Sequence, residues 1–165
     1  MTELFINAVI LKMDENLNRI KHCLGIADND LLWKRPNVSS NSMGHLILHL
    51  NGNITQYIIS CLGGEIDDRK RQAEFDTEKH IENSALLQRH VDTINKANAV
   101  IKSLDSKQLE KSYKVQGFDM TGVDILVHVT EHYSYHTGQI AFWLKLNLNT
   151  DLGFYKDQDL DVRNA

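Results

Sequence analysis

The chain has 165 residues, with 18 Lys or Arg against 22 Asp or Glu and a net charge of −4 when its histidines are neutral. Because the positive charges form no cluster, this acidic balance argues against electrostatic binding to nucleic acid or to an anionic membrane. The apolar run 5–11 is too short to span a bilayer and follows Glu3 rather than a basic segment, which excludes a membrane span or a secretory signal there.

The first predicted element is a long helix over residues 3–24. Its apolar side chains recur at intervals of three and four, with Thr2 placed to act as the N-cap and Gly25 placed just after the end. The segment 28–42 contains the only proline and clustered Asn and Ser residues, so it is predicted to be a connection with a short turn at 31–33.

The second predicted helix begins near Ser42 and ends at the Gly63–Gly64 pair, with one continuous apolar stripe between them. The residues that follow, 65–80, are densely charged and show little periodicity. Such a composition is typical of a solvated loop.

A third helix is predicted over 84–104, followed by an extended stretch at 111–120. Thr121 and Asp124 then form a pattern typical of a capping box, which predicts that a fourth helix begins there and continues to about residue 146. The remaining tail is polar apart from LGFY and is expected on the surface.

Four long helices with sizeable connections predict an all-α protein, a four-helix bundle forming a single domain over residues 1–165. The two cysteines, Cys23 and Cys61, form no CxxC motif and no disulfide framework, and a reducing cytoplasm suits them best.

Three histidines in the fourth helix are the strongest chemical signal. At about 100° per residue, His132 and His136 lie about 40° apart, and His128 falls beside them. Apolar side chains share this arc, whereas Ser134 and Thr137 fall elsewhere on the wheel. The histidines are therefore predicted on the core-facing stripe, where an unpaired polar group costs several kcal/mol.

A metal site accounts for these rings better than separate hydrogen bonds do. Neutral imidazole is a common metal ligand, and a spacing of four residues brings two rings to one ion. In the second helix His49 lies at the edge of the apolar arc, whereas His45 lies further toward solvent. The predicted ligand set is therefore His49, His132 and His136.

Two other metal patterns fit less well. His128, Glu131 and His132 match HxxEH, the inverted zinc-peptidase motif, but no glutamate follows Glu131 to supply the third ligand. A di-iron carboxylate bundle requires Glu-x-x-His on paired helices, and no glutamate in this chain precedes a histidine by three positions.

Four stretches of the chain resemble the DinB/YfiT-like superfamily, and within it an uncharacterised bacterial branch. They are NSMGHLILHLNGNITQYI (41–58), DDRKRQAEF (67–75), HVTEHYSYHTGQIAFW (128–143) and DLGFY (151–155). The resemblance extends from Trp33 to Tyr155, and its most specific part is the histidine placement together with HTGQ.

The resemblance implies a four-helix bundle in which nickel or zinc is held by three histidines, which match His49, His132 and His136. It also implies a homodimer, with the LGFY segment as apolar contact surface. Members are described as metal-dependent hydrolases, and several relatives are S-transferases or isomerases that use low-molecular-weight thiols. In that setting Arg69 and Arg71 are candidates to bind the carboxylates of such a thiol.

Three hypotheses about function follow. The first is a metal-dependent enzyme acting on a small molecule by thiol transfer or hydrolysis; the second is a metal-bound binding or stress-response module without turnover. The third is a structural bundle whose histidines pair without metal. Three neutral ligands leave a coordination position open, as catalytic sites require. No catalytic base is assigned, because Glu131 lies off the histidine axis, and Gln139 and Asn53 suit orienting roles better.

Overall fold

The computed structural model describes residues 1–76 and 81–163. Its long helices are α1 (Thr2–Ile26), α3 (Met43–Ile54) with its π-helical continuation η1 (Thr55–Leu62), α4 (Asn83–Ser103) and α6 (Gly122–Leu148). The shorter elements are α2 (Asn29–Trp33), the 3₁₀ turn η2 (Arg71–Glu74), α5 (Ser106–Glu110), β1 (Ser112–Val115) and β2 (Phe118–Thr121). The expected all-α class is thereby confirmed, with one small hairpin added.

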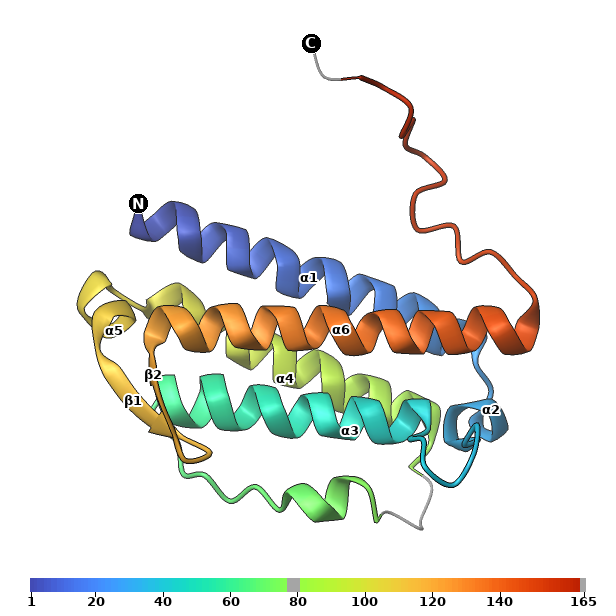
Figure 1. Cartoon of the computed structure of the whole chain (residues 1–165), viewed down its shortest axis with the longest axis horizontal. Coiled ribbons are helices and arrows are strands. Elements are labelled where there is room, and N and C mark those ends of the chain that lie inside the picture. Colours follow the sequence, from blue (N-terminus) through green and yellow to red (C-terminus); the bar gives the residue numbers. More distant parts are fainter. Residues whose placement is uncertain (77–80, 164–165) are drawn as a thin grey trace.

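The four long helices form a bundle in which each packs mainly on two neighbours (Figure 1). Helix α1 contacts α4 and α6, and α3 contacts the same two helices. The first two long helices, α1 and α3, therefore lie diagonally across the bundle, and so do the last two, α4 and α6. Their connections must cross an end of the bundle, which explains why they are long and contain α2 at one end and α5 with the hairpin at the other.

The connection between α3 and α4 is long for a different reason. These two helices run in the same direction, so the chain has to return along the whole bundle before α4 begins (Figure 1). The return segment, residues 65–76, runs along the outside of α3, and η2 packs against that helix. The predicted loop is thus mostly irregular, but it also covers one face of α3. The rest of the predicted charged loop, residues 77–80, lies outside the described residues.

The predicted extended stretch is a two-stranded antiparallel hairpin, with Ser112 opposite Thr121 and Val115 opposite Phe118. Gln116 and Gly117 form its turn with φ angles of 50° and 84°. Positive φ at both central positions matches the right-handed twist of the strands.

Helix boundaries follow local capping chemistry. The side chain of Thr121 accepts from the backbone N–H of Asp124, and the Asp124 carboxylate accepts in return, which confirms the predicted start of α6. The expected cap at Thr2 is wrong: Thr2 is inside α1, Met1 precedes it, and no side chain caps this end. Gly25 also lies within α1, because the helix continues to Ile26.

The buried face of α6 is displaced from the predicted one. Its buried side chains include Val129, Tyr133, Thr137 and Ile140, whereas the histidines are only half-buried. On a helical wheel the centre of this face lies roughly a quarter turn from His132. The expectation that Thr137 lies off the core face is wrong, because α6 packs on α1 as well as on α3. The histidine stripe borders the core rather than forming it.

The first part of the tail, up to Tyr155, packs on the bundle, and residues 156–163 are exposed. Leu152 is buried, and the Phe154 ring lies 5.9 Å from that of His22 and 5.6 Å from the guanidinium carbon of Arg19. Part of the LGFY segment therefore packs within its own chain. No helix in the described ranges combines the length and the apolarity that crossing a membrane requires.

Candidate metal centre

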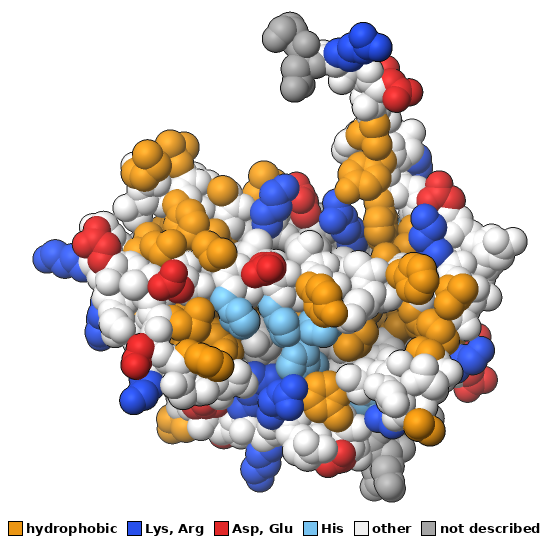
Figure 2. All heavy atoms as spheres, viewed as in Figure 1, with side chains coloured by type: hydrophobic (Ala, Val, Ile, Leu, Met, Phe, Trp, Pro, Cys, Tyr) orange, Lys and Arg blue, Asp and Glu red, His pale blue; other side chains and the backbone are white. Residues whose placement is uncertain are grey.

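Three histidines from two helices meet at the boundary between α3 and α6. The Nε2 atom of His132 lies 3.2 Å from Nε2 of His49 and 3.0 Å from Nε2 of His136. One ligand atom from each ring lies within 4.8 Å of the other two. Figure 2 shows histidine side chains grouped in a hollow on the face of the molecule that is shown, with basic side chains along one edge and apolar ones nearby.

The outer ring nitrogens of His49 and His136 are both hydrogen-bonded. His49 Nδ1 lies 2.9 Å from Glu74 Oε2, and His136 Nδ1 lies 2.6 Å from Gln139 Oε1. A carboxylate and an amide oxygen only accept, so each Nδ1 carries the proton and donates. When the two rings are neutral, each Nε2 atom therefore has a lone pair directed toward the cluster.

Glu74 is held by an arginine from the same return segment. Arg69 donates from Nε to Glu74 Oε1 at 2.7 Å and from Nη2 to Oε2 at 2.9 Å, and its Nη1 donates to Gln56 at 2.9 Å. Burial alone would raise the pKa of Glu74, but hydrogen bonds from His49 and Arg69 and the charge of Arg69 outweigh it. The pKa is lowered, so Glu74 is an ionised acceptor that fixes the ring of His49.

A glycine makes room for this carboxylate. A β-carbon at Gly52 would overlap Glu74 Oε1 and would lie 2.9 Å from Arg69 Nε. Gly52 stands three positions after His49, nearly one turn further along α3. The helix thus presents a histidine ring and, beside it, bare backbone against which the Arg69–Glu74 pair can lie.

An aromatic side chain covers the outer side of His49. The Phe75 ring lies 5.2 Å from the His49 ring, and the guanidinium of Arg71 lies over Phe75 at 5.2 Å. Of the two arginines singled out by sequence, Arg69 is engaged with Glu74 and Gln56, while Arg71 is exposed beside the site.

The environment keeps His132 and His136 neutral. Burial, followed by the charges of His136, His49, His128 and Arg69, lowers the pKa of His132 to about 3. Burial likewise lowers the pKa of His136, and the hydrogen bond with Gln139 only partly offsets this effect. Neutral imidazoles are the form in which histidine binds a metal ion.

The cluster fits a transition-metal ion. Two nitrogens bound to a tetrahedral zinc ion are about 3.3 Å apart, given Zn–N bonds of about 2.0–2.1 Å. The separations of 3.2 Å and 3.0 Å at His132 are close to this value. The Nε2 atoms of His49 and His136 both approach Nε2 of His132, so one cation placed between them could bind all three nitrogens. Nitrogen ligands suit nickel and zinc equally.

Two histidines outside the cluster have other roles. His45 is buried, which contradicts the expected position toward solvent: it forms a capping box with Ser42, and its ring packs edge-on against Trp33 at 5.4 Å. The connection containing Trp33 covers this side of α3. His128 stacks on His132 at 5.7 Å and lies 4.9 Å from Tyr57, which makes it a neighbour of the cluster.

Of the three polar residues that could assist the histidines, only one is hydrogen-bonded to them among the described residues. Gln139 binds His136, which agrees with an orienting role. Glu131 is exposed, and Asn53 is buried without a hydrogen bond to the three histidines in the described part of the chain.

Sequence reasoning missed Glu74 and a buried polar chain formed by Asn51, His90 and Tyr133. Within that chain, His90 Nδ1 lies 2.6 Å from Asn51 Oδ1, and His90 Nε2 lies 2.7 Å from the Tyr133 hydroxyl. Neither feature has a local signature. Both join elements that are distant in sequence and become neighbours only in the bundle.

Bundle and cluster together define a DinB-like helical protein with a site that can hold a metal ion. The chain belongs to a DinB-like family described as Protein of unknown function (DUF1572), whose model matches residues 1–153. A search among curated protein sequences found no match.

Two solved structures share the fold. The DinB-like protein YjoA from Bacillus subtilis has a TM-score of 0.67 and 17% sequence identity, over 87% of this chain and 94% of that one. A DinB-like protein from Bacillus cereus has a TM-score of 0.70 and 14% identity, over 91% of this chain and 94% of that one. These structures agree with the bundle expected from sequence.

Proposed function

We propose that the protein is a metal-dependent enzyme that transfers a low-molecular-weight thiol to an electrophile, with nickel or zinc held by His49, His132 and His136. The observation that supports it most is the convergence of their ring nitrogens, with His49 and His136 oriented by Glu74 and Gln139. A bound ion would supply Lewis acidity and lower the pKa of a thiol or a water.

The surroundings favour thiol transfer over hydrolysis. Hydrolysis requires a base to take a proton from water, and the carboxylate hydrogen-bonded to the cluster, Glu74, is a poor one. It already accepts bonds from His49 and Arg69, and its pKa is lowered. A small thiol brings its own nucleophile and needs no such base.

The protein's own cysteines are unsuited to be that nucleophile. Burial raises the pKa of Cys23 to about 11, and burial together with the charge of Asp67 raises the pKa of Cys61. Both are free thiols, in keeping with the inferred cytoplasmic location. Arg71, exposed on the Phe75 ring beside His49, is the proposed anchor for a carboxylate of the incoming thiol.

The electrophile has a place beside His136. A cavity of about 540 Å³ is lined by His136 and by apolar side chains of α3 and α6, among them Met43, Phe142 and Trp143. The indole N–H of Trp143 is buried and has no hydrogen-bond partner among the described residues. An apolar electrophile with one acceptor atom matches this lining.

Metal content tests the ligand assignment. Purified protein is expected to contain about one transition-metal ion per chain by elemental analysis, lost on replacing His49, His132 or His136 with Ala. His128→Ala is the matched control, because it removes a ring stacked on His132 without removing a proposed ligand. Loss of metal in His128→Ala but not in His49→Ala would favour the inverted-peptidase arrangement instead.

Thiol conjugation tests the reaction. With monochlorobimane, the thiolate sulfur forms a bond to the electrophilic carbon, chloride leaves and the thiol proton passes to solvent. We expect conjugation that depends on the three histidines and survives Cys23→Ser and Cys61→Ser. Histidine-dependent hydrolysis of esters or amides without added thiol would overturn the S-transfer assignment.

A binding module without turnover is the alternative. It shares the metal site, and it predicts that metal-loaded protein binds the thiol but forms no conjugate with any electrophile. Saturable thiol binding without turnover would establish it.

We also infer a homodimer. Tyr135, Phe142 and Leu146 are exposed by 62%, 68% and 63% along one side of α6, where they form the outer lining of the cavity beside His136. Exposed apolar side chains gathered in this way are typical of interaction surfaces. Phe154 and Leu152 of the tail pack within the chain and contribute less than the sequence suggested.

A further inference from the structure

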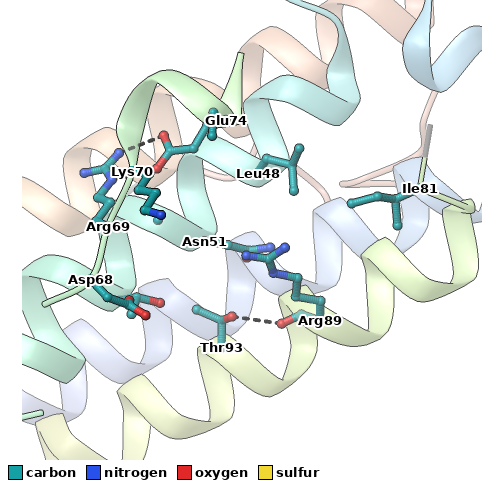
Figure 3. Close-up of a pocket in the computed structure, with 12 residues that line it drawn as sticks. Leu48, Asn51, Asp68, Arg69, Lys70, Glu74, Ile81, Arg89 and Thr93 are labelled. Atoms are coloured by element: carbon teal, nitrogen blue, oxygen red, sulfur yellow. Dashed lines mark hydrogen bonds and ion pairs between the residues drawn. The ribbon is translucent and has the colours of Figure 1, made fainter. Parts of the chain in front are cut away.

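A second cavity lies between α3, α4 and the return segment, and it has a volume of about 450 Å³ (Figure 3). Its charged lining consists of Asp68, Arg69, Lys70, Glu74 and Arg89. None of the three histidines lines it. It is therefore a different site from the metal centre, although Arg69 and Glu74 contribute to both.

A buried amide donor faces this cavity without an acceptor. Asn51 is 1% exposed, lines the cavity, and has no hydrogen-bond partner for Nδ2 among the described residues. A buried donor that lacks an acceptor makes the folded protein less stable. Such a cost is accounted for when a ligand supplies the missing acceptor.

The orientation of this amide is imposed by the core. His90 is fully buried, and burial lowers its pKa to about 4, so it is neutral and carries one proton. Asn51 Oδ1 can only accept, which places that proton on His90 Nδ1, 2.6 Å away. His90 Nε2 then accepts from the Tyr133 hydroxyl at 2.7 Å. The chain of donors runs from Tyr133 through His90 and ends at the Nδ2 group of Asn51.

Two cations stand at the same cavity without ion pairs. Arg89 and Lys70 are exposed, and neither side chain forms an ion pair or hydrogen bond within the described part of the chain. Figure 3 shows the side chains of Arg89 and Asn51 reaching into the cavity from α4 and α3. Arg69 and Glu74 offset each other, so the two free cations outweigh the one free carboxylate, Asp68.

From these observations we propose that the cavity binds a small oxyanion, a carboxylate or phosphate group. Asn51 Nδ2 supplies the oriented neutral donor, and Arg89 and Lys70 supply the charge. Arginine and lysine both bind such groups through charge-assisted hydrogen bonds. The proposal extends beyond the thiol-transfer reaction and does not depend on it.

Titration with inorganic phosphate and with acetate tests the site. Calorimetry at low ionic strength, in a buffer without either anion, is expected to show saturable binding of at least one of them. The anion with the higher affinity shows whether the cavity prefers a phosphate or a carboxylate group. The ¹⁵N-labelled side-chain amide resonance of Asn51 should shift along the same isotherm.

Charge-matched variants locate the binding. Arg89→Gln and Lys70→Gln should each weaken it about tenfold, the loss of one charge-assisted hydrogen bond. Lys102→Gln, which removes an exposed charge in the last turn of α4, should leave the affinity within about twofold of wild type, as expected for a charge distant from the cavity. Binding should persist after the metal is removed with a chelator, whatever the outcome of the conjugation assay.

Three results would overturn the proposal. The first is no saturable binding of either anion, and the second is equal weakening by Lys102→Gln, which indicates a diffuse charge effect. The third is loss of binding on metal removal, which assigns the anion to the histidine cluster. Asn51→Asp, if it folds, should abolish binding because it places a negative charge where the donor was.

Discussion

Glu74 packs against the backbone of α3 at Gly52, so closely that a β-carbon added to Gly52 would overlap a carboxylate oxygen of Glu74. The same carboxylate accepts from His49 Nδ1 at 2.9 Å. A residue with no side chain therefore determines how closely the return segment approaches a proposed metal ligand. Interactions that hold ligating histidines in this way commonly change metal affinity by about 10–100-fold.

Gly52→Ala is expected to lower metal affinity by about tenfold while changing stability little. The new methyl group displaces Glu74 and Arg69, but alanine favours the helix by about 1 kcal/mol. Chelator competition measures the affinity, and urea unfolding of the metal-free protein measures the stability. Gly138→Ala is the control: a β-carbon there contacts nothing, so it should stabilise the protein without changing metal affinity.

Glu74→Gln is expected to reduce metal affinity by about 10–100-fold and to leave the fold intact. The amide has no charge with which to hold Arg69 or to favour the Nδ1–H form of His49. Glu65→Gln, at an exposed ion pair with Lys96 on the same connection, should have no effect on affinity. Equal affinities for Glu74→Gln and wild type would show that Glu74 does not orient the ligand.

Stability should fall as the pH is lowered from about 6.5 to about 4. The pKa of His90 is lowered from 6.5 to about 4 in the folded protein because the ring is buried. Within this window the unfolded chain takes up a proton at His90 and the folded chain does not, so acid favours unfolding. The loss amounts to about 3 kcal/mol and is absent above the window.

Urea unfolding across this pH range, in the presence of a chelator, measures the slope. His90→Gln should be less stable at pH 7, because the partners of Asn51 and Tyr133 change, but it should show a shallower decline. His132 and His136 also have lowered pKa values and account for the slope that remains. An unchanged slope would contradict the assignment to His90.

Sedimentation is expected to show a dimer at tens of micromolar protein, and Leu146→Glu should shift it toward monomer. Leu146 is 63% exposed at the apolar side of α6, so a charge there disfavours association without disturbing the core. Lys145→Gln, at an adjacent exposed position, changes the net charge by the same −1 and is the control for charge alone. A monomer of 18.9 kDa as the only species would contradict the homodimer.

The sequence by itself determined the elements and the proposed ligand set. Apolar spacing identifies the four long helices, because burial of one face imposes the helical period. The spacing of His132 and His136 places their rings on one side of α6, and the apolar arc of α3 places His49 near its edge. These are local relationships, so they can be read without knowing which helices are neighbours.

Only the tertiary structure decided what surrounds these histidines. The parallel direction of α3 and α4 forces the return segment across the face of α3, and this brings Glu74 to His49. The connection between α1 and α3 covers another side of the same helix, where Trp33 packs on the buried ring of His45. The displaced core face of α6, shared between α1 and α3, likewise turns Tyr133 toward His90 and Asn51. Periodicity identifies a helix with one apolar side, but the centre of its buried face and the partner it meets depend on packing between elements far apart along the chain.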